Sequence, residues 1–303
     1  MTELTTTESE HRHIPFKKII ISLCVVLTVI FTVIAVLSSI YPAQSQAITH
    51  TLHEGFSSKS FWTAAGVGLF AQVVDGALGM AYGVTASTFL LSTGVPPAAA
   101  SASVHIAEVF TTGFSGLSHW KLGNINKALF KRLVIPGVIG AVVGAYLLTN
   151  IDGNVIKPFI SGYLLFMGIY ILIKAFKTIR IKTDPPTYVA PLAVTGGFMD
   201  AIGGGGWGPV VTTSLVGSGQ DPRTTIGSVN AAEFFLAIAG GAAFALFGGF
   251  THWTVIVGLV IGGLFAAPIA AVLCAKLPAR TLMVVVGILI SFLSIYNLYN
   301  ALA

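Results

Sequence analysis

The stretch that decides the fold is DAIGGGGWGP, Asp200 to Pro209, where four consecutive glycines interrupt an otherwise apolar part of the chain. A lipid-facing helix is not expected to break there, because each free backbone N–H or C=O group costs several kcal/mol in hydrocarbon. Irregular backbone at membrane depth is tolerated only where protein or a water-filled cavity surrounds it. The glycines therefore predict a broken membrane segment that faces other protein or a cavity.

The composition of the chain is that of a membrane protein. Apolar residues make up 54% of the 303 positions and charged residues only 9%, so apolar runs long enough to span a bilayer fill most of the chain. The lysines and arginines behind the net charge of +5 lie in short clusters between these runs, which is typical of cytoplasmic loops and not of a nucleic-acid surface. Cys24 and Cys274 lie inside apolar runs without Cys or His at ligand spacing, so we interpret them as packing residues. We expect a multi-pass protein of the cell (inner) membrane with no cofactor.

An extra segment precedes the main apolar region. Residues 1–18 are polar and are predicted to form a disordered cytoplasmic N-terminus, and residues 19–40 are long enough for one transmembrane helix. The small residues of AQSQA, Ala43 to Ala47, leave a cleaved signal peptide open as an alternative. Further apolar segments cover residues 62–92, 97–119, 128–149, 157–176, 188–217, 223–247, 253–275 and 280–301.

The glycine stretch has a counterpart 125 positions earlier in the chain. DGALGMAYGVTASTFLLSTGVPPAAASASVHIAEVF, Asp75 to Phe110, aligns without a gap on DAIGGGGWGPVVTTSLVGSGQDPRTTIGSVNAAEFF, Asp200 to Phe235. The identical pairs include Asp75 with Asp200, Gly79 with Gly204, Gly83 with Gly208, Gly94 with Gly219, Pro97 with Pro222 and Glu108 with Glu233. We therefore predict two homologous halves, residues 62–176 and 188–301.

Loop charges predict how the two halves are oriented. Lys17 and Lys18 place the N-terminus in the cytoplasm, and loops poor in lysine and arginine are expected outside, near 41–61, 150–157 and 248–252. The other basic clusters are expected inside: Lys121, Lys127, Lys131 and Arg132, then Lys174, Lys177, Arg180 and Lys182, then Lys276 and Arg280. Two apolar segments, 62–92 and 97–119, separate the first outside loop from the next inside loop. One of them is therefore not a simple crossing.

The segment 62–92 is too long for a simple crossing. A continuous helix of about 31 residues would measure roughly 46 Å, against a hydrocarbon core of about 30 Å. We predict a re-entrant hairpin of two half-helices that meet at the glycines, and the same reasoning makes 188–217 a second hairpin. The predicted fold is an all-α polytopic membrane protein. It has one N-terminal helix plus two inverted repeats, each a Gly-broken re-entrant helical hairpin and three transmembrane helices, with the C-terminus outside.

This architecture is typical of secondary transporters. Their broken helices meet near the membrane midplane, and the N-termini of the half-helices point at anionic groups of the substrate. The amide groups that follow Asp75 and Asp200 would then face one site from opposite sides. Two plainer interpretations stay open. Glycines such as Gly79 and Gly83 also serve close helix packing, and each aspartate can cap the half-helix that follows it.

Two glutamates and a histidine also lie inside apolar segments. Glu108 and Glu233 occupy matched positions, where a charge is expensive and normally faces a cavity or a partner. They are candidates for a substrate or proton role, or else neutral hydrogen-bonding groups that fix the hairpins. His105 lies one turn before Glu108 on the same helix face, with Asn230 at its matched position. The histidine either takes up a proton when an anion binds or packs as a hydrogen-bonded ring.

Four stretches resemble the TauE/SafE sulfite exporter family, a group of small two-repeat membrane permeases. They are DGALGMAYG, SVHIAEVFTTGFSGLSHWKLGN, DAIGGGGWGP and GSVNAAEFF. The resemblance covers the chain from about Trp62 to the C-terminus. It implies export or uptake of small sulfur-containing anions such as sulfite, sulfoacetate or related organosulfonates. It does not fix the anion, because members of the family differ in substrate.

The expected site residues follow the two glycine stretches and the histidine. No lysine or arginine lies deep in a span, so backbone N–H groups and hydroxyls would bind the anion, while Tyr82 and Trp207 would wall the site. The predicted substrate-binding residues are Gly79, Tyr82, Gly83, Thr85, Ser87, His105, Gly203, Gly204, Gly205, Gly206, Trp207, Gly208, Thr212, Thr213 and Asn230. The predicted coupling or structural carboxylates are Asp75, Glu108, Asp200 and Glu233. The expected partners are a small anionic substrate and the lipid bilayer, with no nucleic acid and with a homo-oligomer left open.

Other functions have less support in the sequence. A divalent-metal or other small-ion permease would use His105, Glu108 and Glu233 as ligands, but no further clustered ligand accompanies them. An intramembrane hydrolase would need a nucleophile and a base in a fixed arrangement. Ser118 and His119 are neighbours and point to different faces of a helix. A purely structural role gives the paired carboxylates no purpose.

Overall fold

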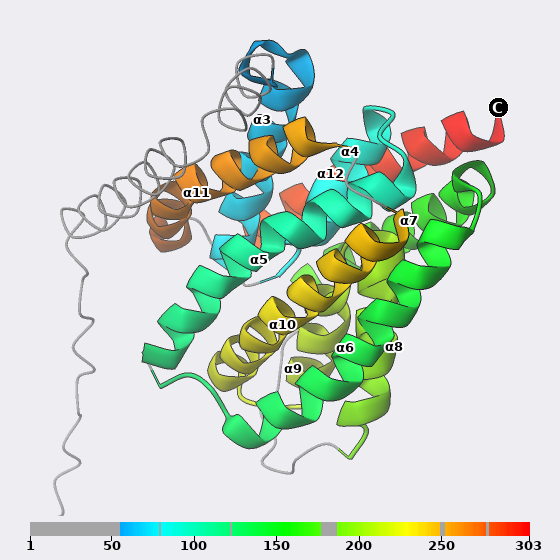
Figure 1. The fold of residues 1–303 in the computed structure, drawn as a ribbon. Helices are drawn as coiled ribbons and strands as arrows, with labels where there is room; N and C mark the ends of the chain where they lie inside the picture. Colours follow the sequence, from blue (N-terminus) through cyan, green and yellow to red (C-terminus); the bar gives the residue numbers. More distant parts are fainter. Residues whose placement is uncertain (1–54, 79, 122, 177–186, 249–251, 277–278) are drawn as a thin grey trace, which may run out of the picture. The chain divides into compact units, whose positions relative to one another are not determined.

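The computed structural model describes residues 55–303 except 79, 122, 177–186, 249–251 and 277–278 (Figure 1). The described residues form helices and no strand, which confirms the predicted all-α class. The predicted N-terminal tail and the helix at 19–40 lie outside the described residues. The described elements are α3 (Lys59–Leu78), α4 (Tyr82–Ser92), α5 (Pro97–Lys121), α6 (Lys127–Asn150), α7 (Gly153–Ala175), α8 (Val189–Gly203), the π-helical turn η1 (Gly208–Thr212), α9 (Thr213–Gly217), α10 (Pro222–Gly248), α11 (Trp253–Lys276) and α12 (Ala279–Leu302).

Local sequence signals explain where several helices begin. Pro97 and Pro222 open α5 and α10, because proline is preorganised for the first helical position and lacks only an N–H that would be unpaired there. Asn126 caps α6 by accepting from two backbone amides at 3.1 Å, and Asp152 caps α7 by accepting from the Asn154 amide at 2.8 Å. These caps fix the ends of α6 and α7 through short polar side chains.

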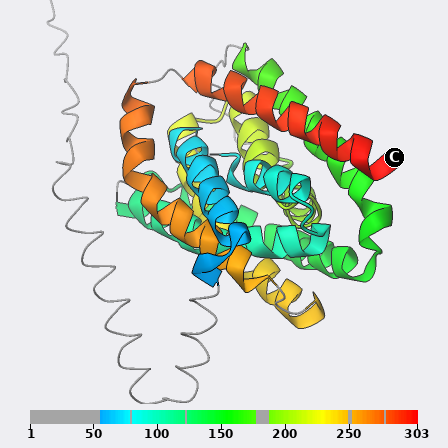
Figure 2. The same cartoon turned by 90° about the horizontal axis from the view of Figure 1, so that it is seen from above.

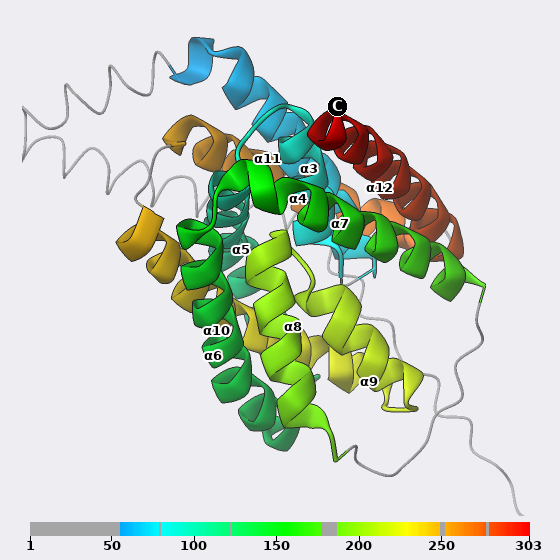
Figure 3. The same ribbon diagram turned by 90° about the vertical axis from the view of Figure 1, so that its right-hand side faces the viewer.

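Both long apolar segments are broken near their glycines, as the sequence predicts. The first break lies between Leu78 at the end of α3 and Tyr82 at the start of α4, and Ala81 within it has a positive φ of 86°. The second break, Gly204 to Trp207, separates α8 from η1. Figure 3 shows α8 running up to this break and η1 with α9 running back from it. Each segment therefore reverses direction instead of continuing as one helix.

Four helices among the described residues are long and apolar enough to cross a membrane. Their bounds are Lys127–Asn150, Gly153–Ala175, Pro222–Gly248 and Met283–Leu302. Two shorter apolar helical stretches, Val189–Gly203 and Trp253–Ala266, accompany them. This pattern is that of a polytopic membrane protein.

The helices pack in pairs. α3 lies against α11 and α7 against α12, and Figure 2 shows both pairs, blue beside orange and green beside red. α8 lies against α6, and α10 lies between α5 and α6 (Figure 1). Glycines allow close approach in two of these pairs. Gly144 of α6 faces the Phe198 carbonyl of α8, and a Cβ there would lie 2.8 Å from the oxygen, while Gly258 of α11 faces the Phe61 carbonyl of α3 at 2.6 Å.

Candidate functional site

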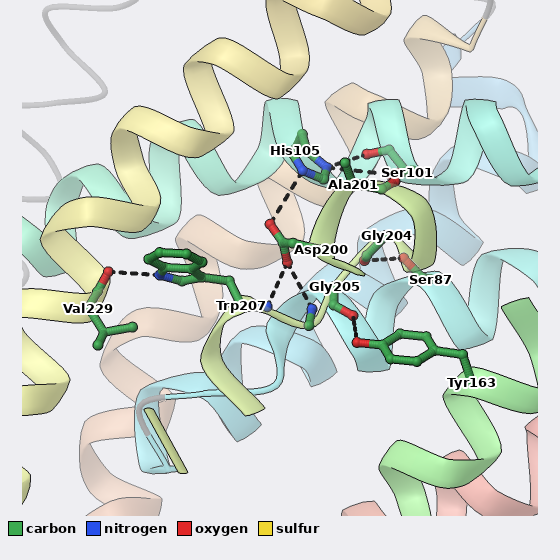
Figure 4. Close-up of polar contacts among 11 residues, drawn as sticks. Ser87, Ser101, His105, Tyr163, Asp200, Ala201, Gly204, Gly205, Trp207 and Val229 are labelled. Carbon is green, nitrogen blue, oxygen red and sulfur yellow. Dashed lines mark hydrogen bonds and ion pairs between the residues drawn. The ribbon is translucent and has the colours of Figure 1, made fainter. Parts of the chain in front are cut away.

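The two breaks touch one another. A Cβ added to Gly83, the second residue of α4, would lie 2.6 Å from the Gly205 Cα and 2.9 Å from the Gly204 carbonyl oxygen. The approach therefore requires glycine on the α4 side. On the other side, Gly204 and Gly205 have φ of 64° and 149°, which residues with a side chain rarely adopt. The Ser87 hydroxyl donates to the Gly204 carbonyl and closes the contact (Figure 4).

Asp200, in the last turn of α8, organises the second break. Its Oδ1 accepts from the backbone amides of Gly206 at 2.8 Å and Trp207 at 3.0 Å, which is the capping geometry (Figure 4). In the first break, Asp75 Oδ1 accepts from the Tyr82 amide at a longer 3.4 Å. These amides therefore donate within the protein, and they are not the free anion donors that the sequence predicts.

His105 of α5 faces the remaining oxygen of Asp200. Its Nδ1 lies 2.9 Å from the Ser101 carbonyl oxygen, one turn earlier, and its Nε2 lies 3.4 Å from Asp200 Oδ2. The Ser101 hydroxyl donates to the Ala201 carbonyl at 2.5 Å, which ties α5 to the end of α8. Both side chains of the facing pair are buried. Figure 4 shows the ring directed at the carboxylate.

Glu108 completes a compact group with His105 and Asp200. It lies one turn after His105 and is buried, with Oε1 near Gly83: a Cβ on that glycine would lie 2.8 Å from the oxygen. His105, Glu108 and Asp200 each offer one atom such that the three atoms lie within 4.8 Å of one another. We call these residues the trio. The trio therefore lies directly beside the contact between the two breaks.

Several buried polar atoms near the breaks lack a hydrogen-bond partner among the described residues. Buried polar groups are normally paired, so a group of unpaired atoms indicates a place for a ligand, an ion or water. Six of these atoms belong to residues that the sequence predicts for the site. The complete set is Gln72 Oε1, Tyr82 Oη, Thr85 Oγ1, His105 Nε2, Glu108 Oε2, Asp200 Oδ2, Thr212 Oγ1 and Ser294 Oγ.

Glu233 of α10 belongs to the same electrostatic group. It is partly buried, and its carboxyl interacts electrostatically with Asp200 and Asp75, as does that of Glu108. Its neighbour on α10, Asn230, instead donates to the Ser115 hydroxyl at 3.0 Å, about three turns beyond His105 along α5. The four predicted carboxylates thus influence one another electrostatically, whereas Asn230 has a separate partner.

Trp207 is placed differently from the sequence prediction. The side chain is fully buried in an apolar cluster with Leu236 and Val211, and its indole Nε1 donates to the Val229 carbonyl at 3.1 Å. A Cβ on Gly137 of α6 would lie 2.8 Å from the indole ring. Trp207 therefore fills the core between α6, α8 and α10 instead of walling the site, because the apolar ring and its one donor are both satisfied there.

We expect Trp207→Ala to lower the free energy of unfolding by about 3–5 kcal/mol, because it leaves a large cavity. Trp207→Phe keeps most of the packing and removes the indole donor, so the expected loss is about 1 kcal/mol. Thermal unfolding of the purified variants in detergent measures both. If Trp207→Ala leaves thermal stability unchanged and weakens substrate binding, Trp207 lines the substrate site and does not serve core packing.

The other predicted residues flank the second break or follow it. Thr213 donates to the Pro209 carbonyl and shares a 2.9 Å hydrogen bond with the Tyr170 hydroxyl of α7, so it anchors η1 and α9. Gly208 packs against Met80, with a Cβ expected 3.0 Å from that side chain. Gly203 and Gly206 pack against the Tyr163 side chain. Gly79 lies outside the described residues.

Three residues of this region are absent from the set predicted from the sequence. Tyr163 of α7 donates to the Gly205 carbonyl at 3.3 Å, and no local pattern links it to the break (Figure 4). Ser101 lies one turn before His105 and Gln72 about one turn before Asp75, and both are buried. That helical spacing from a predicted site residue is a signal that could have identified them.

Comparison with known proteins gives one family and one relative. A family model described as sulfite exporter TauE/SafE matches residues 64–297. The chain is also similar to the probable membrane transporter protein YtnM of Bacillus subtilis (strain 168), with 45% identity over 243 residues, or 77% of this chain and 81% of that protein. No solved structure matches the chain.

Proposed function

The chain belongs to the sulfite exporter TauE/SafE family, and from that premise we propose that it moves small sulfur-containing anions, such as sulfite, sulfoacetate or related organosulfonates, across a membrane. The family and the relative are those of membrane transporters, so the chain is a membrane transporter and not an enzyme. Its apolar helices agree with a location in the membrane. The substrate class, the inner membrane and the orientation of the termini belong to the proposal.

The proposed architecture is a pair of inverted repeats, residues 62–176 and 188–301. Corresponding elements begin at corresponding positions: α5 at Pro97 and α10 at Pro222 are 125 residues apart. The helix pairs support the same relation. In the two halves α3 corresponds to α8, α5 to α10, α6 to α11 and α7 to α12. The contact of α3 with α11 therefore corresponds to the contact of α8 with α6. The contacts of α5 with α10 and of α7 with α12 each join two corresponding helices. A two-fold relation between the halves would produce this pattern.

Cysteine labelling tests the orientation of the two hairpins. In a protein whose native Cys24 and Cys274 are replaced by serine, we expect Thr93→Cys to label from outside the cell and Ser218→Cys from inside. Thr93 follows α4 and Ser218 follows α9, so the residues report the open ends of the two hairpins. Membrane-impermeant maleimides applied to intact cells and to inverted vesicles measure the labelling. Labelling of both cysteines from the same face would contradict the inverted repeats.

The observation that carries the proposed site is the contact of the two breaks at Gly83 and Gly205, beside unpaired buried polar atoms. Secondary transporters bind substrates where discontinuous helices meet, and alternating access opens such a site first to one face and then to the other. Hydroxyl groups of Tyr82, Thr85 and Thr212 can donate to sulfite or sulfonate oxygens. Because acidic side chains surround this place, Glu108 or Glu233 is proposed to carry a proton with the anion.

Flux measurements test the function. Purified protein in proteoliposomes is expected to exchange radiolabelled sulfite and short organosulfonates, and an imposed pH gradient is expected to drive their accumulation. A sodium gradient without a pH difference is the matched control for coupling, and liposomes without protein give the leak. If no anion moves and a divalent metal does, the divalent-metal permease replaces this proposal.

A further inference from the structure

The site lacks the positive charge that an anion requires. Asp75, Glu108, Asp200 and Glu233 interact electrostatically there, and no lysine or arginine is buried among the described residues. The backbone amides that could have compensated are partly used by Asp200. An anion that enters this region therefore meets carboxylates and hydroxyls, and a further cation is needed to offset the carboxylates.

The hydrogen bonding of His105 directs a lone pair at Asp200. The Ser101 carbonyl can only accept, so Nδ1 of His105 carries the proton of that 2.9 Å contact. In the neutral ring Nε2 is then an acceptor, and it lies 3.4 Å from Asp200 Oδ2, which is also an acceptor. Two acceptors that face each other in a buried place need a proton or a metal ion between them.

Glu108 shows that a single proton is not enough. Its Oε2 is buried and has no hydrogen-bond partner in the described part of the chain. A proton between His105 and Asp200 would satisfy that pair and leave Glu108 Oε2 unpaired. A metal ion accepts lone pairs from all three atoms at once, and because these atoms lie within 4.8 Å of one another, a small movement of the side chains would bring all three to bonding distance.

One separation in the trio and the donor types of its members suit a first-row transition metal. Bonds of about 2.1 Å place two ligand atoms of a tetrahedral site about 3.4 Å apart, which matches the separation of His105 Nε2 and Asp200 Oδ2. An imidazole nitrogen with two carboxylates suits zinc or manganese better than calcium, which takes oxygen ligands only.

Other groups of the protein hold the ligands in place. The Ser101 carbonyl orients the imidazole, and the two amides of the second break fix Asp200 through Oδ1, which leaves Oδ2 directed at the ring. Such outer contacts are what metal-ligating histidines and carboxylates normally have. The trio therefore has ligand atoms and the supports that orient them.

We propose that His105, Glu108 and Asp200 bind one divalent transition-metal ion, and that this ion supplies the positive charge for the transported anion. The role of the ion in holding the anion rests on the proposed function. The metal site rests on the geometry of the trio alone. An ion with three protein ligands keeps a coordination position for a further ligand, and Glu108 Oε1 lies beside Gly83 at the contact of the two breaks. Glu233 lies outside the trio and remains available to carry a proton.

Calorimetric titration of metal-free, full-length protein with Zn²⁺ at neutral pH tests the site. Asp200→Asn keeps an oxygen to accept the two break amides and replaces the other oxygen with an NH₂ group, so it removes a ligand and preserves the cap. We expect Asp200→Asn and Glu108→Gln each to weaken Zn²⁺ binding by about 100-fold or more, since changes in the outer shell alone cost 10–100-fold. Asp221→Asn is the control for the loss of one carboxylate outside the site: Asp221 is exposed before α10, and the affinity of this variant is expected to equal that of the wild type.

If a variant does not fold, the visible absorption spectrum of the wild-type protein with Co²⁺ still tests the metal site. Visible bands of a low-coordinate cobalt site that disappear on adding Zn²⁺ support the proposal. A failure of the wild type to bind either metal overturns it, and so does an equal loss of affinity in Asp221→Asn, which would indicate nonspecific binding to acidic groups.

The metal site and the anion function can fail separately. Protein that binds Zn²⁺ at the trio and moves no sulfite upholds the site and removes the proposed substrate. Protein that moves sulfite equally well in chelator-treated and Zn²⁺-loaded liposomes overturns the role of the ion in holding the anion. A flux that falls with the chelator and returns with Zn²⁺, in the wild type but not in Asp200→Asn, supports the whole proposal.

Discussion

Replacing Gly205 with alanine is expected to abolish transport and to destabilise the protein. The Cβ would overlap the backbone of Gly83, which cannot move without shifting α4, and the φ of 149° is strained for any residue with a side chain. The strain costs about 1–3 kcal/mol and the overlap a similar amount, so the sum is comparable to the whole stability margin of many proteins. Thermal unfolding in detergent and sulfite flux in proteoliposomes measure the two effects.

Two other glycines separate the causes. Gly94 has a positive φ of 89° but nothing within 4 Å of its missing Cβ, so Gly94→Ala reports the backbone strain alone. Gly162 in α7 has neither a positive φ nor a neighbour within 4 Å, so Gly162→Ala is expected to behave as the wild type. If Gly205→Ala loses no more stability than Gly94→Ala, the contact between the two breaks is not required.

Replacing Glu108 with glutamine is expected to lower sulfite flux by about 100-fold, which corresponds to about 2.7 kcal/mol, while the fold is retained. Glutamine matches the shape of glutamate and removes its ability to bind a proton or a cation. The carboxylate is buried beside Gly83 with one oxygen unpaired, so no other side chain of the described residues takes over its contacts. Flux under an imposed pH gradient, with size-exclusion profiles as a check on folding, measures the effect.

Asp221→Asn is the matched control for the loss of one carboxylate. Asp221 precedes α10 at an exposed position, and hydrogen bonds from Thr224 hold the pKa of its carboxyl below the usual range. Asparagine also caps helices, so this variant changes the charge without removing the cap. We expect its flux to equal that of the wild type. An unchanged flux in Glu108→Gln would mean that the buried carboxyl has only a structural role.

The helix breaks were predictable because their signals are local. Pro97 and Pro222 mark helix starts, and the glycines after Asp200 mark a place where only residues without a side chain fit. The 125-residue offset then carried each signal from one half to the other. The arrangement of the helix pairs had no such local signal, since an apolar helix in a membrane offers similar faces to several neighbours.

The sequence pointed to polar residues that the structure brings together near the breaks, but it did not predict which of them face each other. As the ligands of the alternative divalent-metal permease, the sequence suggested His105, Glu108 and Glu233, since Glu and His one turn apart can share a metal. The structure instead places Asp200 opposite His105, at 3.4 Å. This contact depends on how the end of α8 docks on α5, which the Ser101 hydroxyl fixes through the Ala201 carbonyl. Spacing along one helix cannot report such a contact.

Three hydrogen bonds also connect the second break and the end of α8 to helices of the first half of the chain. Ser87 of α4, Ser101 of α5 and Tyr163 of α7 each donate to a carbonyl between Ala201 and Gly205. A motion that separates the halves at this place must break all three hydrogen bonds, each contributing about 1 kcal/mol. We therefore expect the two breaks to act as a common pivot that stays assembled through the transport cycle. The surrounding helices would then swing about this pivot while the contact between Gly83 and Gly205 stays closed.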